Sequence, residues 1–189
     1  MVRILIGSIL GGLAQFFVGF IFWGTPLARL AFASLGPAES TAVQLALAQN
    51  LTKSGTGTYA IPLTGTREGD ILFAKGPVAT VHFNVEGFPL ADSGSLLAGL
   101  IFSIVTALLI GIALYGVASR VTALADRMRL VVLFAAASVL YFTLAQPVFN
   151  HFGWGYFVYL AISEFIGFAV AGLVIARWFL PRPAAMTVH

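Results

Sequence analysis

Four runs of the sequence carry almost no charged residues, and each is long enough to cross a lipid bilayer as a helix. Spanning a hydrocarbon core of about 30 Å takes about 20 predominantly apolar residues. The runs are residues 4–23, 94–119, 130–150 and 152–178, and only the last contains charged residues, Glu164 and Arg177. Over the whole chain, 59% of the residues are hydrophobic and 9% are charged, whereas soluble domains have about 25% charged residues. We predict an α-helical integral membrane protein with four transmembrane helices.

The distribution of basic residues predicts the orientation of these helices, because Lys and Arg in short loops favour the cytoplasmic side. One side would carry six basic residues and one acidic residue, and the other four basic and five acidic residues. We therefore expect both termini in the cytoplasm and residues 24–93 outside. Short loops and a compact length favour a bacterial inner membrane, which would make residues 24–93 periplasmic. The six basic residues are Arg3, Arg120, Arg127, Arg129, Arg177 and Arg182.

Residues 24–93 form the long segment outside the apolar runs, and their pattern changes along the segment. Apolar residues recur at helical spacing between positions 38 and 51. Alternating residues then predict strands at 59–63, 71–74 and 79–85, with a polar turn between the first two. We predict a small α+β extramembrane domain inserted between the first and second transmembrane helices.

Small residues recur at helical spacing in the first, second and fourth apolar runs. A helix face without large side chains lets another helix approach closely, and such contacts drive helix association in membranes. The pattern predicts a four-helix bundle or a dimer, but not an activity. The predicted packing residues are Gly7, Gly11, Gln15 and Gly19 in the first run, Ser103, Ala107 and Gly111 in the second, and Glu164, Gly167 and Ala171 in the fourth.

Glu164 is the residue on which a functional hypothesis can rest, because a carboxylate within a membrane is costly and is usually paired, protonated or functional. At 1.5 Å per residue, Glu164 lies about 19 Å from Arg177, and Gln15 lies about 18 Å from Arg3. The two polar side chains are thus at similar depth, and we expect a hydrogen bond between them. The bond would either fix the helix register or belong to a proton or cation site.

A second group of polar and aromatic residues surrounds the predicted turn between the third and fourth helices. Tyr and Trp are typical of membrane interfaces, so anchoring is their expected role. A lipid or quinone headgroup could also bind there, whereas haem would need a second axial ligand and no apolar run has a His in its interior. The group consists of Gln146, Asn150, His151, Trp154, Tyr156 and Tyr159.

The sequence contains no common catalytic motif. GxxxxGK, HExxH and GxSxG are all missing, and there is no Cys to serve as a nucleophile or metal ligand. The net charge of +3 is small and dispersed, which disfavours binding to nucleic acid. We therefore expect no enzymatic activity, no metal site and no dedicated cofactor, although a bound lipid or quinone fits the composition.

The remaining features favour a protein that acts by contact. We expect a non-enzymatic accessory or scaffolding protein that packs, through its glycine-rich faces and outer domain, against a larger membrane complex or a second copy, with membrane lipids around it. The main alternative is a small proton- or cation-coupled transporter or channel that uses Glu164. It would have to be oligomeric, because four helices without an internal repeat are few for a transporter. A lipid-, quinone- or haem-binding redox protein is a third alternative.

Overall fold

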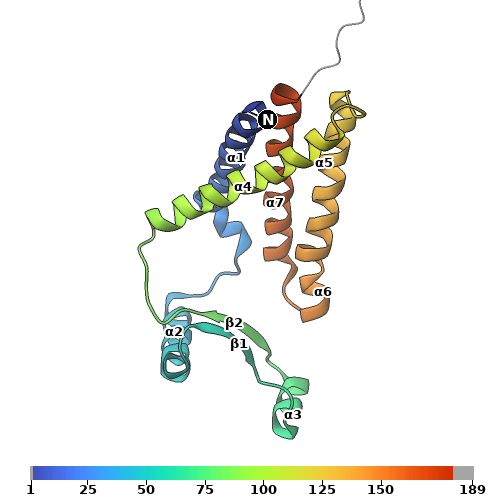
Figure 1. The fold of residues 1–189 in the computed structure, drawn as a ribbon. Coiled ribbons are helices and arrows are strands. Elements are labelled where there is room, and N and C mark those ends of the chain that lie inside the picture. The colour runs from blue at the N-terminus through green and yellow to red at the C-terminus, as the bar shows by residue number, and fades with distance from the viewer. Residues whose placement is uncertain (1, 181–189) are drawn as a thin grey trace, which may run out of the picture. The chain divides into compact units, whose positions relative to one another are not determined.

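Four helices are long and apolar enough to cross a membrane in the computed structural model, which describes residues 2–180 (Figure 1). They are Val2–Trp23, Ser93–Val117, Leu124–Asn150 and Trp154–Phe179. The four predicted apolar runs are thus confirmed as helices. The third begins clearly earlier than predicted, because Arg127 and Arg129 lie within its first turns and not in a loop before it. Arg182 lies outside the described residues.

The chain divides into two compact units, each described here by itself. The helical unit comprises the described residues up to Ala33 and from Ser93 onward, and the inserted unit is Ser34–Asp92. A short 3-10 helix, η1 (Pro26–Ala31), packs against the last long helix and belongs to the helical unit. The inserted unit therefore begins after Ala33, later than the predicted boundary at residue 24.

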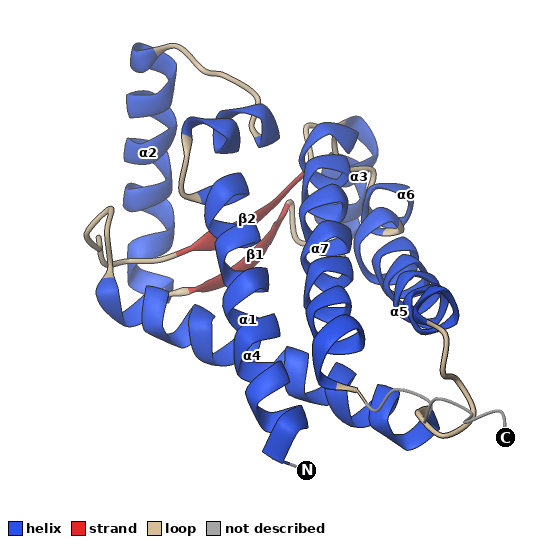
Figure 2. Cartoon of the chain, turned by 90° about the horizontal axis from the view of Figure 1, so that it is seen from above, coloured by secondary structure: helices blue, strands red, loops and turns tan. Residues whose placement is uncertain are grey.

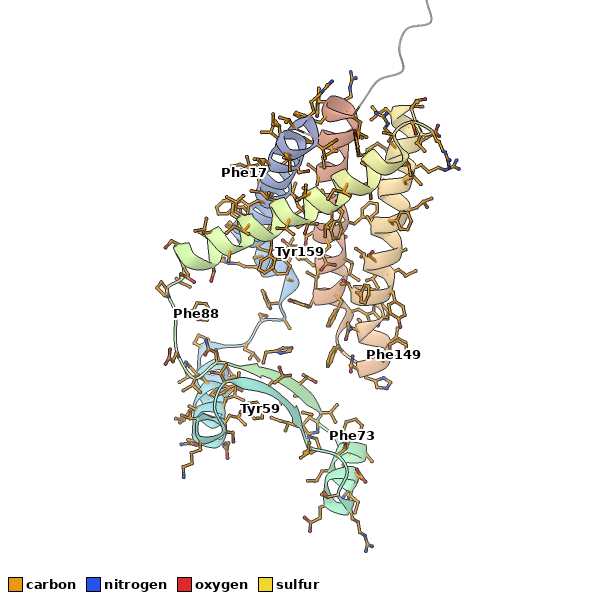
Figure 3. The ribbon with its side chains drawn as sticks, viewed as in Figure 1. Phe17, Tyr59, Phe73, Phe88, Phe149 and Tyr159 are labelled. Carbon is orange, nitrogen blue, oxygen red and sulfur yellow. The ribbon has the colours of Figure 1, made fainter. Side chains whose placement is uncertain are left out.

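In the helical unit, α1 (Val2–Trp23) packs against both α4 (Ser93–Val117) and α7 (Trp154–Val174). On its other side α7 packs against α5 (Leu124–Val139), so α7 lies between α1 and α5 (Figure 2). The buried core is built from small and branched side chains, including Ala107, Val131, Ala171 and Ile175. Large apolar side chains such as that of Phe17 instead project outward, as expected for a surface that faces lipid (Figure 3).

The third membrane helix is irregular near its end. After α5 the backbone forms a π-helical turn, η3 (Leu140–Leu144), and continues as α6 (Gln146–Asn150), with Pro147 in the first turn of α6. Because proline has no N–H to donate, the regular hydrogen-bond ladder cannot continue through it. The helix ends at His151, whose φ of 54° places it in the left-handed region. A second π-helical turn, η4 (Ile175–Phe179), follows α7.

The inserted unit contains two helices and a two-stranded sheet (Figure 1). Helix α2 (Pro37–Leu51) confirms the helix predicted for this region. A short 3-10 turn, η2 (Thr52–Ser54), leads into β1 (Gly57–Ile61), which pairs antiparallel with β2 (Ala79–Phe83). Tyr59 lies opposite Val81, and its ring contacts Phe83 at a centroid distance of 6.4 Å.

The strand predicted at residues 71–74 is wrong, because this segment lies in a helix, α3 (Arg67–Lys75). Thr66 caps the helix by accepting a hydrogen bond from the Gly69 N–H at 3.0 Å. Acidic residues stand in the first turn and Lys75 in the last, which suits the helix dipole. The polar residues interpreted as a turn are therefore the start of this helix.

Candidate functional site

Glu164 is hydrogen-bonded to the neighbouring helix within the bundle. The Thr143 hydroxyl donates to Glu164 Oε2 at 2.6 Å, and Thr143 is only 5% exposed. Thr143 belongs to η3, the π-helical turn, so the helical irregularity and the acidic residue meet at one place. Isolated π-helical turns occur frequently at functional sites. Thr143 was missed in the sequence because a hydroxyl in an apolar run is unremarkable on its own.

The predicted hydrogen bond between Gln15 and Glu164 is not formed. Gln15 contacts α7 at Gly167 instead, where a Cβ built on the glycine would lie 3.4 Å from Gln15 Cγ. Gly167 is about one turn along the helix from Glu164. Gln15 Oε1 is buried and has no hydrogen-bond partner among the described residues. The polar site thus consists of a bonded Thr143–Glu164 pair with an unsatisfied amide oxygen near it.

The glycine face of α1 packs against other helices of the same chain. A Cβ on Gly7 would lie 2.6 Å from Phe179 Cβ, and one on Gly11 would lie 3.1 Å from the Ala171 carbonyl oxygen. The adjacent face meets α4, since a Cβ on Gly12 would lie 2.5 Å from the Ile104 Cα. These close approaches of backbone to helix make the α1 glycines part of the internal packing.

The other predicted packing residues differ in their surroundings. Gly111 lies against Ser8, and Ala107 and Ala171 are fully buried. The Ser103 hydroxyl donates to the Gly99 carbonyl of its own helix at 3.0 Å. Nothing approaches within 4 Å of the position of a Cβ on Gly19. Gly111, Ala107 and Ala171 thus lie at buried positions of the bundle, whereas the Ser103 hydroxyl bonds within its own helix and Gly19 has open space beside it.

The six residues around the α6–α7 turn do not form one polar site. Asn150 Nδ2 donates to Gln146 Oε1 at 3.0 Å and to the Gln146 carbonyl at 3.2 Å, so these two residues are bonded to each other on α6. His151 is exposed at the left-handed end of that helix. Trp154 is also exposed, at the first position of α7. This placement suits residues at an interface more than a converging binding pocket.

Tyr156 and Tyr159 instead join an aromatic cluster with the end of α1. The Tyr159 hydroxyl donates to the Phe22 carbonyl at 2.6 Å, and the centroid of the Tyr159 ring lies 5.2 Å from that of Trp23. Trp23 Nε1 also donates to Ser163 Oγ at 3.2 Å. The Phe32 ring contacts the Trp23 ring edge to face and the Tyr156 ring at a tilt. The hydrogen bonds that join α1 to α7 in this cluster were not foreseen from the sequence.

Arginines gather at the opposite end of the helical unit. The Arg3 guanidinium donates to the Trp178 carbonyl at 3.2 Å. Arg127 is only 3% exposed, and it donates to the carbonyls of Val121 at 2.9 Å and Ala176 at 3.4 Å. Cations are favourable at the carbonyl end of a helix. Arg3 and Arg127 therefore bind carbonyls of η4, at the end of the last membrane helix, in addition to the effect on topology that the sequence predicts.

The inserted unit leaves its apolar side chains uncovered. Gly69 is the one buried residue in residues 34–92, all of which are described, and α2 buries none. Thr58 Oγ1 lies 3.0 Å from His82 Nδ1 across the exposed strand pair. Among residues 2–180, no three acidic or His side chains are grouped so that they could hold a metal ion. The exposed apolar residues include Val43, Leu45, Leu63, Ile71, Leu72, Phe73, Val85, Phe88 and Leu90.

Comparison with known proteins gives no match to a family model, to a curated protein or to a solved structure.

Proposed function

We propose that this chain is a non-enzymatic accessory or scaffolding protein of a membrane, which holds a partner through its inserted unit. The observation that carries the proposal is the missing core of that unit. Exposed apolar surface of this extent is typical of an interaction site. A small domain is marginally stable even when it buries about 60% of its unfolded surface. The inserted unit therefore needs a covering surface.

The packing inside the helical bundle restricts the surfaces at which such a partner could bind. Gly7, Gly11 and Gly12 of α1 already pack against η4, α7 and α4, so this part of the glycine face is not free to receive another protein. Contact with a larger membrane complex or a second copy would therefore involve the inserted unit and the outward-facing apolar side chains. This arrangement favours a protein that binds a partner through its surface over an enzyme with an enclosed active site.

Photo-crosslinking in the native membrane tests the proposal. A photoreactive amino acid replaces Phe73 on α3 or Leu45 on α2, both of which are exposed and apolar. Lys53 in η2 is the matched control, because it is an exposed polar position in the same unit. We expect Phe73 and Leu45 to give one discrete adduct, whose mass identifies a second protein or a second copy. No adduct from Phe73 or Leu45, or an equal yield from Lys53, would contradict the proposal.

A second candidate function is a small oligomeric transporter or channel for protons or cations. The Thr143–Glu164 hydrogen bond at a π-helical turn favours it, together with the unpartnered Gln15 Oε1. Acidic residues within membrane helices often mark ion pathways. Glu164→Gln in reconstituted vesicles should then abolish proton- or cation-dependent flux, while Glu39→Gln in the inserted unit should not. Unchanged flux in Glu164→Gln would remove this residue from any transport mechanism.

A further inference from the structure

Glu164 stands deep in the helical unit, and one oxygen of its carboxyl group has no partner. It lies about 15 Å along α7 from Trp154, near the middle of a hydrocarbon core of about 30 Å. Thr143 donates to Oε2, whereas Oε1 accepts no hydrogen bond from residues 2–180, and no basic side chain in this range forms an ion pair with Glu164. Acidic residues within membrane helices are usually paired. The free oxygen is therefore available to a cation.

A second acceptor without a donor lies close to this carboxyl group. Gln15 Oε1 is buried and has no hydrogen-bond partner among the described residues. Gln15 contacts α7 at Gly167, where a built Cβ would lie 3.4 Å from Gln15 Cγ. Positions three residues apart on a helix are about 5–6 Å from each other, so Gln15 meets α7 one turn from Glu164. Two helices thus supply acceptor oxygens that lack donors, and leaving such oxygens without a partner is costly.

An apolar pocket begins on the same face of α7. It has a volume of about 450 Å³ and lies between α4 and α5, with Phe168 as its lining residue on α7. Phe168 follows Glu164 by four residues, which places both on one face of the helix, and helical side chains tilt toward the N-terminus, here toward Glu164. Ser138, the polar residue of the lining, precedes Thr143 by five residues, about 7 Å along the helix axis. On both helices the pocket therefore ends close to the Thr143–Glu164 bond.

The size and the opening of the pocket fit a small molecule that arrives from the bilayer. Sites for small molecules usually have volumes of about 300–1,000 Å³ and are mostly apolar, with a few polar groups that fix the ligand. The lining is apolar apart from Ser138. Leu109 and Phe134 are 64% and 72% exposed, so the pocket opens at the outer surface of the bundle. A ligand can therefore enter from the hydrocarbon core without crossing the bundle.

We propose that this site binds a hydrophobic amine, whose ammonium group lies at Glu164 and Gln15 and whose apolar part lies in the pocket. An ammonium group carries a positive charge and several N–H donors, so it supplies a donor to both oxygens at once. A neutral or anionic lipid would leave the carboxyl group without a cation. The inference rests on the second candidate function for its site at Glu164, but it names the class of cation and requires binding, not transport.

Calorimetric titration of the full chain, purified in a neutral detergent, with adamantylamine and adamantanol tests the proposal. The two probes share one apolar cage, and only the amine is cationic at neutral pH. Glu164→Gln removes the charge and keeps an oxygen that can accept from Thr143. Asp126→Asn is its matched control, because Asp126 is an exposed acid in the first turn of α5. Ala113→Phe fills the pocket, and Ala136→Phe is its control, because Ala136 is exposed and does not line the pocket.

We expect the wild-type chain to bind adamantylamine about tenfold more tightly than adamantanol, because hydrogen bonds to charged groups are strong. Glu164→Gln should remove this preference, and Asp126→Asn should keep it. Gln15→Leu should weaken binding of the amine about fivefold. Ala113→Phe should weaken binding of both probes, whereas Ala136→Phe should not.

Equal affinity of the wild-type chain for the two probes would overturn the proposal. So would unchanged binding of the amine in Glu164→Gln or in Ala113→Phe, or a dimer that binds no amine because a second copy fills the pocket. Binding that depends on Glu164, without flux of protons or cations in vesicles, would support the amine site and remove the transporter. Flux that Glu164→Gln abolishes, without binding of the amine, would support the transporter and overturn the amine site.

Discussion

Glu164 receives a short hydrogen bond from a buried threonine, and this bond connects the last two membrane helices. The donor, Thr143, stands in the π-helical turn before Pro147, so the local backbone irregularity places the hydroxyl where the carboxyl group can accept from it. The bond has a structural effect whether or not Glu164 also exchanges protons or cations. Its loss would leave a polar group without its partner inside the bundle.

Thr143→Val is therefore expected to lower the free energy of unfolding by about 1–3 kcal/mol, the usual effect of leaving a buried polar group unsatisfied. Thr106→Val is the matched control, since Thr106 lies in α4 and has no hydrogen-bonded partner among the described residues. Thermal unfolding in a mild detergent measures both variants. Equal stability of the two would contradict a stabilising role for the bond.

The partner of Glu164 shows the limit of reasoning from spacing alone. Counting the rise per residue placed Gln15 at nearly the right depth, about one turn from Glu164 at Gly167. It could not decide between neighbours, because Thr143 and Glu164 are also about equally far from the turn at Gly153. Whether Gln15 or Thr143 bonds to Glu164 depends on how each helix is rotated about its axis. The π-helical turn changes the rotation of the third membrane helix, and regular periodicity does not predict that change.

At the scale of whole elements, the membrane helices were predicted from the sequence and α3 was missed. Long apolar runs allow one structure in a bilayer, because a helix satisfies all of its backbone hydrogen bonds internally. The short segment Arg67–Lys75 has both an alternating stretch and helix signals, and its type is decided by the cap that Thr66 provides. Thr66, the acidic first turn and Gly76 after Lys75 are the signals that could have identified this helix.

The crossing of α1 and α4 gives a sharp test of element packing. Gly12→Ala would place a Cβ 2.5 Å from the Cα and 2.7 Å from the N of Ile104, so backbone would have to move. We expect a loss of about 1–3 kcal/mol of stability from this overpacking. Gly19→Ala is the matched control, because nothing lies within 4 Å of its new Cβ and alanine favours helix. If Gly12→Ala were as stable as Gly19→Ala, the close approach of α1 and α4 would be wrong.

At the scale of the whole molecule, the arginines give the bundle a distinct end. Arg3 and Arg127 contact η4, which follows α7, and the α4–α5 connection carries Arg120. Figure 1 shows the start of α1, the end of α7 and the start of α5 at this same end of the helical unit. The distribution of charge favours the cytoplasm for it, and the two connections at the other end, one of which carries the inserted unit, would then lie outside.

Cysteine labelling tests this orientation cleanly, because the chain has no Cys of its own. A membrane-impermeant maleimide added to intact cells should label Ser54→Cys in the inserted unit. Thr122→Cys, between α4 and α5, should react only after the membrane is opened. Each variant serves as the control for the other. Labelling of Thr122→Cys in intact cells, with protection of Ser54→Cys, would reverse the topology.

We propose that the membrane-embedded helical unit carries an inserted unit that is completed by a partner. Native mass spectrometry of the protein, extracted gently from its own membrane, tests this proposal, because mass distinguishes a monomer, a homo-oligomer and a hetero-complex. We predict a defined complex with another protein or a second copy, which Phe73→Asp dissociates and Lys53→Asp leaves intact. A monomer carrying only lipid would contradict the account.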